Sequence, residues 1–259
     1  MLVSICMATY NGGKFIREQV DSILNQQFVE NKDVELELVV SDDGSTDNTI
    51  DILKSYQDQR IKVFLHSNKK KYRYLNATRA CKCNFENAMS KAQGDYIFLS
   101  DQDDLWYPCK IDKQLSVLRK LGGVNAAAFD MGDGELRKIN TLIYRHNVPF
   151  FTIKNVLCLY GFSLAFTREE LKFFLPIPSS TTGHDTYIQY SAMWRKTLSF
   201  IDEPCAIHRY SGKHNVSSFG KNNILPPFYI KLYFRFITIM SVIWRSLVRR
   251  KFIKAYLYV

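Results

Sequence analysis

Short apolar segments alternate with helical patterns over the first half of this chain, and this order restricts its fold more than any other feature. Apolar runs over residues 3–8, 36–40, 61–65 and 96–100 are each followed by a segment whose apolar side chains recur every three or four residues. Strands separated by crossover helices pair in parallel. The pattern therefore predicts an α/β fold with a mostly parallel central sheet flanked by helices.

The second half of the chain is less regular. Further strands are expected over residues 126–131, 163–166, 198–201 and 205–210. A short helix should follow the capping-box pattern of Thr167 and Glu170, and another should open at residues 183–185. Pro226 and Pro227 mark a boundary before the C-terminal tail.

Polar loops follow three of the expected strands, at residues 9–13, 42–45 and 101–104. The carboxyl ends of parallel strands are where ligands gather in such sheets. The third loop holds three carboxylates within four residues, and these repel one another unless a cation or hydrogen-bond donor meets them. Mg²⁺ and Mn²⁺ prefer oxygen ligands and commonly carry substrate phosphates. The loops therefore predict a metal-dependent enzyme for a phosphorylated substrate, with Asp104 expected to cap the next helix instead of binding the metal.

Motifs in these loops occur in a family-specific order. Residues 8–12 read ATYNG, residues 42–47 read DDGSTD and residues 100–104 read SDQDD. They resemble the inverting family 2 glycosyltransferases with the GT-A fold. The GDY at residues 94–96 and the W-x-P-x-K at residues 106–110 are similar to the rhamnosyltransferase-like branch of that family.

This resemblance implies a site for a nucleotide-sugar donor. Asp43 matches the family position whose carboxylate accepts the N3–H of a uracil or thymine ring. The first loop, with Ala8, Thr9 and Tyr10, is expected to lie against the base and ribose. Asp101 is expected to face the ribose or the waters of the metal.

The resemblance also implies the metal and the catalytic base. Asp103 is expected to bind Mn²⁺ or Mg²⁺, and His214 resembles a late family histidine that completes the metal shell. Asp185 matches the general base that takes the proton of the acceptor hydroxyl, although an acid at a helix start is also favoured by the helix dipole. His184 is left open as an acceptor contact, and His208 is expected to be structural.

The net positive charge of the chain lies toward its C-terminus. No Asp or Glu follows Glu203, and ten Lys and Arg residues follow it, which accounts for the net charge of +10. Residues 228–244 are rich in aromatic and β-branched side chains but interrupted by basic ones, so they are expected to lie on a membrane rather than span it. The residues that form a polar stripe along this expected helix are Lys231, Arg235, Thr238, Ser241, Arg245 and Arg249. The alternative is a helix packed on the catalytic domain or on a second subunit.

These features predict two parts. Residues 1–223 form the catalytic domain, with a donor half over residues 1–110 and an acceptor half over residues 111–223, and residues 224–259 form a basic amphipathic tail. The six cysteines show no zinc spacing and no signal peptide is visible, so the expected location is the cytoplasmic face of the membrane.

The expected activity is transfer of a sugar, rhamnose among the candidates, from a UDP- or dTDP-sugar to a glycan or lipid-linked acceptor in surface polysaccharide synthesis. A metal-dependent nucleotidyltransferase would explain Asp101 and Asp103 but gives Asp185 no task. A phosphatase of the haloacid dehalogenase type would place its acids after the first strand. A basic membrane- or nucleic-acid-binding protein is a third alternative, but no nucleic-acid recognition motif appears, so no nucleic-acid partner is expected.

Overall fold

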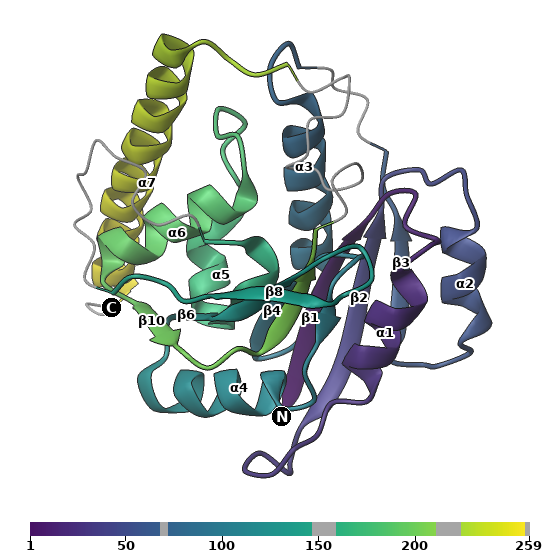
Figure 1. The fold of residues 1–259 in the computed structure, drawn as a ribbon. Coiled ribbons are helices and arrows are strands. Elements are labelled where there is room, and N and C mark those ends of the chain that lie inside the picture. The colour runs from purple at the N-terminus through teal and green to yellow at the C-terminus, as the bar shows by residue number, and fades with distance from the viewer. Residues whose placement is uncertain (68–71, 147–158, 211–223, 257–259) are drawn as a thin grey trace.

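A seven-stranded mixed sheet forms the centre of the molecule (Figure 1). The computed structural model describes residues 1–67, 72–146, 159–210 and 224–256, with side chains described up to residue 248. The strands of this sheet are β1 (Leu2–Thr9), β2 (Glu35–Asp42), β3 (Ile61–Leu65), β4 (Tyr96–Ser100), β6 (Val124–Ala127), β9 (Leu164–Thr167) and β10 (Leu198–Ile201). Their order is β10-β6-β9-β4-β1-β2-β3, and β9 alone runs antiparallel to its neighbours β4 and β6. The predicted, mostly parallel α/β sheet is confirmed.

A second, four-stranded sheet stands beside the first. It consists of β5 (Leu105–Trp106), β7 (Phe129–Gly132), β8 (Lys138–Leu142) and β11 (Ala206–Arg209), in the order β5-β11-β7-β8. The single strand expected over residues 126–131 is wrong, because the chain leaves the central sheet at Ala128. There the Ala128 N–H donates to the Ile201 carbonyl (2.7 Å) and the Ala128 carbonyl accepts from the Cys205 N–H (2.9 Å).

Helices flank the central sheet. They are α1 (Ile16–Leu24), α2 (Thr49–Ser55), α3 (Asn76–Lys91), α4 (Lys110–Leu121), α5 (Arg168–Phe174), α6 (His184–Arg195) and α7 (Phe228–Tyr256), with a 3₁₀ turn at Gly161–Ser163. The predicted apolar stripes face the sheet, as Ile16, Val20 and Ile23 of α1 are fully buried. Helix α5 begins after Thr167 as predicted, although the Thr167 side chain makes no capping hydrogen bond.

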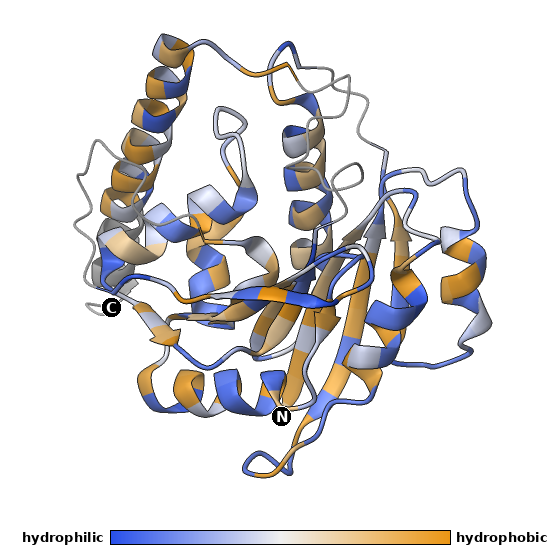
Figure 2. Ribbon diagram, viewed as in Figure 1, coloured by the Kyte–Doolittle hydropathy of each residue, from blue (hydrophilic) through white to orange (hydrophobic). Residues whose placement is uncertain are grey.

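The core lies on both faces of the central sheet. Ile5, Val39 and Phe98 on neighbouring strands have no exposed surface, and Figure 2 shows the apolar colour concentrated in these strands. Burial on both faces explains why the strands appear in the sequence as continuous apolar runs.

The tail helix α7 packs on the catalytic domain, against α6 and α5 (Figure 1). Thr238 and Val242 are each 1% exposed, and Arg245 donates from Nη1 to the Phe174 carbonyl at 3.0 Å. The alternative of a packed helix therefore describes α7, and Arg235, Thr238 and Arg245 of its polar stripe turn toward the domain. The large apolar side chains left exposed on the helix are Phe228, Tyr229, Leu232, Tyr233, Phe236, Met240, Trp244 and Leu247.

Within the described part of the chain, none of the helices, α7 included, combines the length and the hydropathy that crossing a membrane requires.

Candidate active site

The first loop, after β1, is fixed to the acidic loop after β4. The Tyr10 N–H donates to Oε1 of Gln102 at 2.9 Å, and Nε2 of Gln102 donates back to the Tyr10 carbonyl at 3.1 Å. A Cβ added to Gly12 would lie 2.3 Å from the same Oε1, so this approach needs glycine. Gln102 thus joins the two loops, a role that its position between two acids does not reveal in the sequence.

The loop after β2 places Asp42 and Asp43 in different environments. Asp42 is buried and accepts hydrogen bonds from the Ser45 N–H (2.8 Å) and the Thr9 hydroxyl (2.8 Å), so it shapes the loop. Asp43 is half-buried, and its N–H donates to the Thr9 carbonyl at 3.0 Å. Thr9 is therefore committed to the loop structure, whereas the Tyr10 side chain is 58% exposed.

The three acids of the loop after β4 also differ. Asp101 is half-buried, Asp103 is 9% exposed and Asp104 is completely buried. Oδ1 of Asp104 lies 2.7 Å from Nδ1 of His208 and accepts the Arg209 N–H at 3.2 Å. The expectation that Asp104 caps a helix is wrong, because strand β5 intervenes and α4 starts only at Lys110. His208, stacked on Phe162, is structural as predicted.

Burial and mutual repulsion set the charge of this loop. Burial and then the Asp104 charge raise the pKa of Asp103 to about 7. Burial and the charges of Asp104 and Asp103 raise the pKa of Asp101 well above its usual range. Burial opposes a charge on His208, but the adjacent Asp104 outweighs it and raises the pKa of His208 to about 9. Among the described residues no basic side chain forms an ion pair with Asp101 or Asp103, and the nearby charges of His208 and Arg209 only partly offset the rise in pKa. A bound cation would complete the neutralisation.

Arg209 supports the same loop from the opposite end of the chain. Its Nε donates to the Asp103 carbonyl at 3.0 Å, its Nη1 donates to the Gly134 carbonyl at 2.7 Å, and its Nη2 pairs with Glu18. Sequence reasoning missed this residue because its partners lie 106, 75 and 191 positions away.

Asp185 lies in the first turn of α6 and is partly exposed. Its Oδ1 accepts the Thr186 N–H at 2.6 Å. The turn ahead of the helix is held by the buried Lys82, whose Nζ donates to the carbonyls of Pro178 (3.2 Å) and Thr181 (3.1 Å). Lys82 therefore fixes the segment from which Asp185 projects.

His184, the neighbour of Asp185, is buried. Its ring stacks on Phe85 with centroids 4.0 Å apart, and a Cβ on Gly161 would lie 2.4 Å from its Nε2. The ring therefore anchors α6 to α3, and the open suggestion that it contacts an acceptor does not fit its burial.

The predicted site acids converge on one point of α3. The pKa of the Cys81 thiol is raised well above its usual value by burial, followed by the charges of Asp101, Asp185, Asp103 and Asp43. Because Coulomb interactions weaken with distance, all four carboxylates lie around this thiol. Two loops and one helix start that are far apart in the sequence thus meet at one place.

The two predicted metal ligands are Asp103 and His214. Asp103 lies in the acidic loop after β4, whereas His214 lies outside the described residues. Within the described ranges no group of three or more His, Cys, Asp and Glu side chains forms a complete metal site. The under-neutralised carboxylates of Asp101 and Asp103 suit a hard cation that takes its other ligands from a phosphorylated substrate and water.

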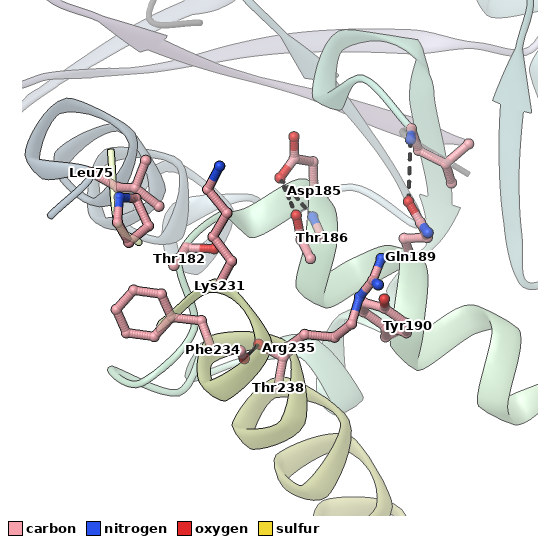
Figure 3. Close-up of a pocket in the computed structure, with 12 residues that line it drawn as sticks. Leu75, Thr182, Asp185, Thr186, Gln189, Tyr190, Lys231, Phe234, Arg235 and Thr238 are labelled. Atoms are coloured by element: carbon pink, nitrogen blue, oxygen red, sulfur yellow. Dashed lines mark hydrogen bonds between the residues drawn. The ribbon is translucent and has the colours of Figure 1, made fainter. Parts of the chain in front are cut away.

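A pocket of about 250 Å³ opens beside Asp185, between α6 and α7 (Figure 3). Lys231 and Arg235 of α7 reach into it from the side opposite α6. The lining residues are Leu75, Leu159, Thr182, Asp185, Thr186, Gln189, Tyr190, Pro226, Lys231, Phe234, Arg235 and Thr238. None of the other three site acids lines it, so Asp185 stands between the acid cluster and the pocket.

Comparison with known proteins identifies the family of the chain. Residues 4–172 match the family model described as glycosyl transferase family 2. The dTDP-rhamnosyl transferase RfbG of Shigella flexneri is 40% identical over 116 residues, which are 43% of this chain and 36% of that protein. The Escherichia coli UDP-Glc:alpha-D-GlcNAc-diphosphoundecaprenol beta-1,3-glucosyltransferase WfgD is 30% identical over 148 residues, 57% of this chain and 51% of that protein. The matched segments thus cover about a third to a half of these relatives.

Solved structures share the fold. S. aureus TarS 1-349 in complex with UDP-GlcNAc superposes with a TM-score of 0.64 at 20% identity, covering 85% of this chain and 62% of the TarS 1-349 chain. The mannosyltransferase PcManGT from Pyrobaculum calidifontis, in complex with GDP-Man and Mn²⁺, has a TM-score of 0.53 at 15% identity, covering 96% of this chain and 75% of that one. At such identities the likeness concerns the fold alone.

Proposed function

The chain belongs to glycosyl transferase family 2, and from this membership we propose that it is an inverting transferase that moves a sugar from a nucleoside diphosphate to a hydroxyl group of an acceptor. The observation that supports the proposal best is the convergence of Asp43, Asp101, Asp103 and Asp185 around Cys81. Base recognition and proton removal each need a carboxylate, and diphosphate binding needs a cation held by carboxylates. The four side chains are sufficient for these three tasks.

The donor lies across the ends of β1, β2 and β4. Asp43 accepts the N3–H of a uracil or thymine base, so the donor is a UDP- or dTDP-sugar. The loop of Ala8, Thr9 and Tyr10, fixed by its two hydrogen bonds to Gln102, supports the base and ribose. The relation to RfbG makes a rhamnosyl donor a candidate.

Asp103 holds a divalent cation, Mn²⁺ or Mg²⁺, with Asp101 beside it and His214 as a further ligand. The cation, when bound, stabilises the negative charge of the departing nucleoside diphosphate. The raised pKa values of Asp101 and Asp103 support this assignment, because the described positive charges nearby, His208 and Arg209, do not offset burial and the repulsion between the acids. PcManGT, which shares the fold, is seen with Mn²⁺.

Asp185 is the general base. It removes the proton of the acceptor hydroxyl as that oxygen forms a bond to the anomeric carbon, while the bond from this carbon to the diphosphate oxygen breaks on the opposite face. The hydrogen bond from Thr186 fixes one carboxylate oxygen and leaves the other directed away from the Thr186 N–H (Figure 3). Such a base contributes about 10²–10⁴-fold to the rate.

The acceptor is a glycan or a lipid-linked precursor in surface polysaccharide synthesis, and the enzyme works at the cytoplasmic face of a membrane. Residues 1–223 supply the catalytic domain, with the donor half before residue 111, and residues 224–259 supply the membrane contact. The exposed apolar side chains on the outer face of α7 support this location.

A donor screen combined with one variant tests the proposal. The wild type should gain thermal stability with one of the UDP-, dTDP- and GDP-sugars in the presence of Mn²⁺. Asp185→Asn should keep this gain and lose sugar transfer to a membrane-extracted acceptor by about 10²-fold or more. Normal turnover in Asp185→Asn would rule out this base, and the absence of any nucleotide-dependent shift would reject the donor assignment.

A further inference from the structure

The inner face of α7 is polar where a packed helix is normally apolar. A surface helix usually turns its apolar stripe to the core and its charged residues to water. Here Thr238 is buried, Lys231 and Arg235 line the pocket beside α6, and Phe236 and Met240 are exposed on the outer side. This reversal brings two cationic side chains, one helical turn apart, to the general base that is proposed above.

The pocket belongs to the acceptor side of Asp185. The charge of Asp185 contributes to the raised pKa values of Asp101 and Cys81, so its carboxylate is close to the donor acids. The same Asp185 lines the pocket, whereas Asp43, Asp101 and Asp103 do not. A ligand in the pocket would therefore contact Asp185 from the side facing away from the donor.

The pocket is built for an anion. Among the residues that line it, Lys231 and Arg235 are the two basic ones and Asp185 is the one acid. Thr182 adds a hydroxyl group, whereas the hydroxyls of Thr186 and Thr238 already donate to Asp185 and to the Phe234 carbonyl. In Figure 3 Lys231 extends toward Asp185, and Arg235 extends toward Gln189 and Tyr190. An ammonium and a planar guanidinium one helical turn apart on the same wall of a cavity suit the tetrahedral oxygens of a phosphate.

The volume restricts what can enter. Pockets that enclose a whole small ligand are about 300–1,000 Å³, and this one is about 250 Å³. It therefore holds one end of a longer acceptor. The pocket borders α7, and the opposite face of this helix carries the exposed apolar residues that a lipid-linked substrate would meet.

We propose that this pocket, lined by Asp185, Lys231 and Arg235, binds a phosphate or diphosphate group of the acceptor close to the hydroxyl that receives the sugar. The inference rests on the proposed function and names the class of its acceptor as a phosphorylated saccharide. It also makes α7 a part of the acceptor site in addition to its proposed contact with a membrane.

Binding of soluble anions to the full chain tests the proposal without knowledge of the acceptor sugar. With EDTA present to keep metal out of the donor site, inorganic pyrophosphate and N-acetylglucosamine 1-phosphate are titrated by calorimetry. We expect saturable binding that falls with added salt. Lys231→Gln and Arg235→Gln should each weaken it about tenfold or more, and Lys231→Arg should restore most of it.

The matched control is Lys172→Gln, which removes the same charge from an exposed position on α5 outside the pocket. It should bind both anions as the wild type does. Thermal melting of each variant shows that it is folded. Equal binding by Lys231→Gln and the wild type, or no saturable binding by the wild type, would overturn the proposal. Equal binding of glucuronate and N-acetylglucosamine 1-phosphate would overturn the preference for phosphate.

Two further measurements distinguish this inference from two alternatives, in which Lys231 and Arg235 serve the bilayer or the donor site. If the pocket variants lose binding to phosphatidylglycerol vesicles but keep binding to the soluble anions, the cations serve the bilayer and the acceptor assignment fails. If they lose binding of UDP with Mn²⁺ instead, the cations belong to the donor site and the inference fails as well. In both cases UDP binding by the wild type shows that the proposed function survives, whereas its absence would reject that function independently of the pocket.

Discussion

At the scale of single residues, Asp103 is the carboxylate whose environment most favours a bound cation. Replacement by Asn removes the charge and keeps the shape, so Asp103→Asn should weaken Mn²⁺-dependent UDP binding about tenfold or more. Titration of Mn²⁺ into the protein with UDP, followed by thermal shift, measures this. Asp51→Asn on the exposed side of α2 is the control, and unchanged Mn²⁺ dependence in Asp103→Asn would contradict the assignment.

The raised pKa of Asp103 gives a pH dependence with a defined sign. A metal needs the deprotonated carboxylate, and the Asp103 pKa is about 7 without metal. The apparent Mn²⁺ affinity of the UDP complex should therefore fall as the pH decreases below about 7, and should level off above it. The measurement should span about pH 5.5 to about pH 8, which lie roughly one unit or more on either side of that pKa. A Mn²⁺ affinity that stays constant over this range would show that Asp103 does not carry the metal.

His208 should contribute strongly to stability. It neutralises the completely buried Asp104, and breaking a buried pair from one side costs about 3–5 kcal/mol. His208→Gln should lose about this much free energy of unfolding in urea. Because the folded pKa of about 9 exceeds the usual 6.5, this contribution is fully present below pH 6.5 and is lost as the pH rises through 9. The difference in free energy of unfolding between the wild type and His208→Gln should therefore decrease at high pH. A difference that stays constant with pH would contradict the pairing of His208 with Asp104.

At the scale of secondary-structure elements, α7 does more than attach a tail. It buries Thr238 and Val242, and Arg245 donates to carbonyls at the end of α5. Deletion of residues 228–259 uncovers α6, and the loss of one buried valine alone removes about 1.5–3 kcal/mol. The truncated protein should therefore melt at a lower temperature than the full chain. A truncation with unchanged melting would mean that α7 does not pack on the domain in solution.

The elements that the sequence predicts well are those whose pattern is local. Strands β1 to β4 and the helices between them show continuous apolar runs or three-to-four-residue stripes, which follow from burial on a sheet. Strands β6 and β7 were merged into one, because the change of sheet at Ala128 depends on backbone partners at Ile201 and Cys205. Strand β5 is only two residues long, too short for a pattern.

The candidate site likewise contains residues that local sequence motifs predict and residues that they do not. The carboxylates Asp43, Asp101, Asp103 and Asp185 can be chosen from motifs, because loops that follow parallel strands meet at one edge of the sheet. The side chains that hold them in place cannot, since Arg209 acts across contacts of up to 191 positions. The inward direction of the polar stripe on α7 was also beyond the sequence, because periodicity defines two faces and does not say which one meets the domain.

At the scale of the whole molecule, the position of α7 separates two roles of the tail. Its inner face borders the site beside Asp185, and its outer face presents large apolar side chains at intervals of about one turn. Truncation would remove both roles and destabilise the domain, so it cannot isolate the membrane contact. Substitutions confined to the outer face can.

Phe236 and Trp244 are 59% and 71% exposed on this outer face. If the face lies in the membrane interface, the double variant Phe236→Ser/Trp244→Ser should bind phosphatidylglycerol vesicles about tenfold less tightly or worse, because it loses two apolar side chains from the lipid contact. Flotation of the purified full chain with vesicles measures this, and thermal melting should stay close to the wild type since both side chains are exposed. Leu121→Ser, at a 65% exposed apolar position on α4, is the control and should float as the wild type does. Full flotation of the double variant would show that the outer face of α7 does not meet the membrane and leave it free to contact another protein.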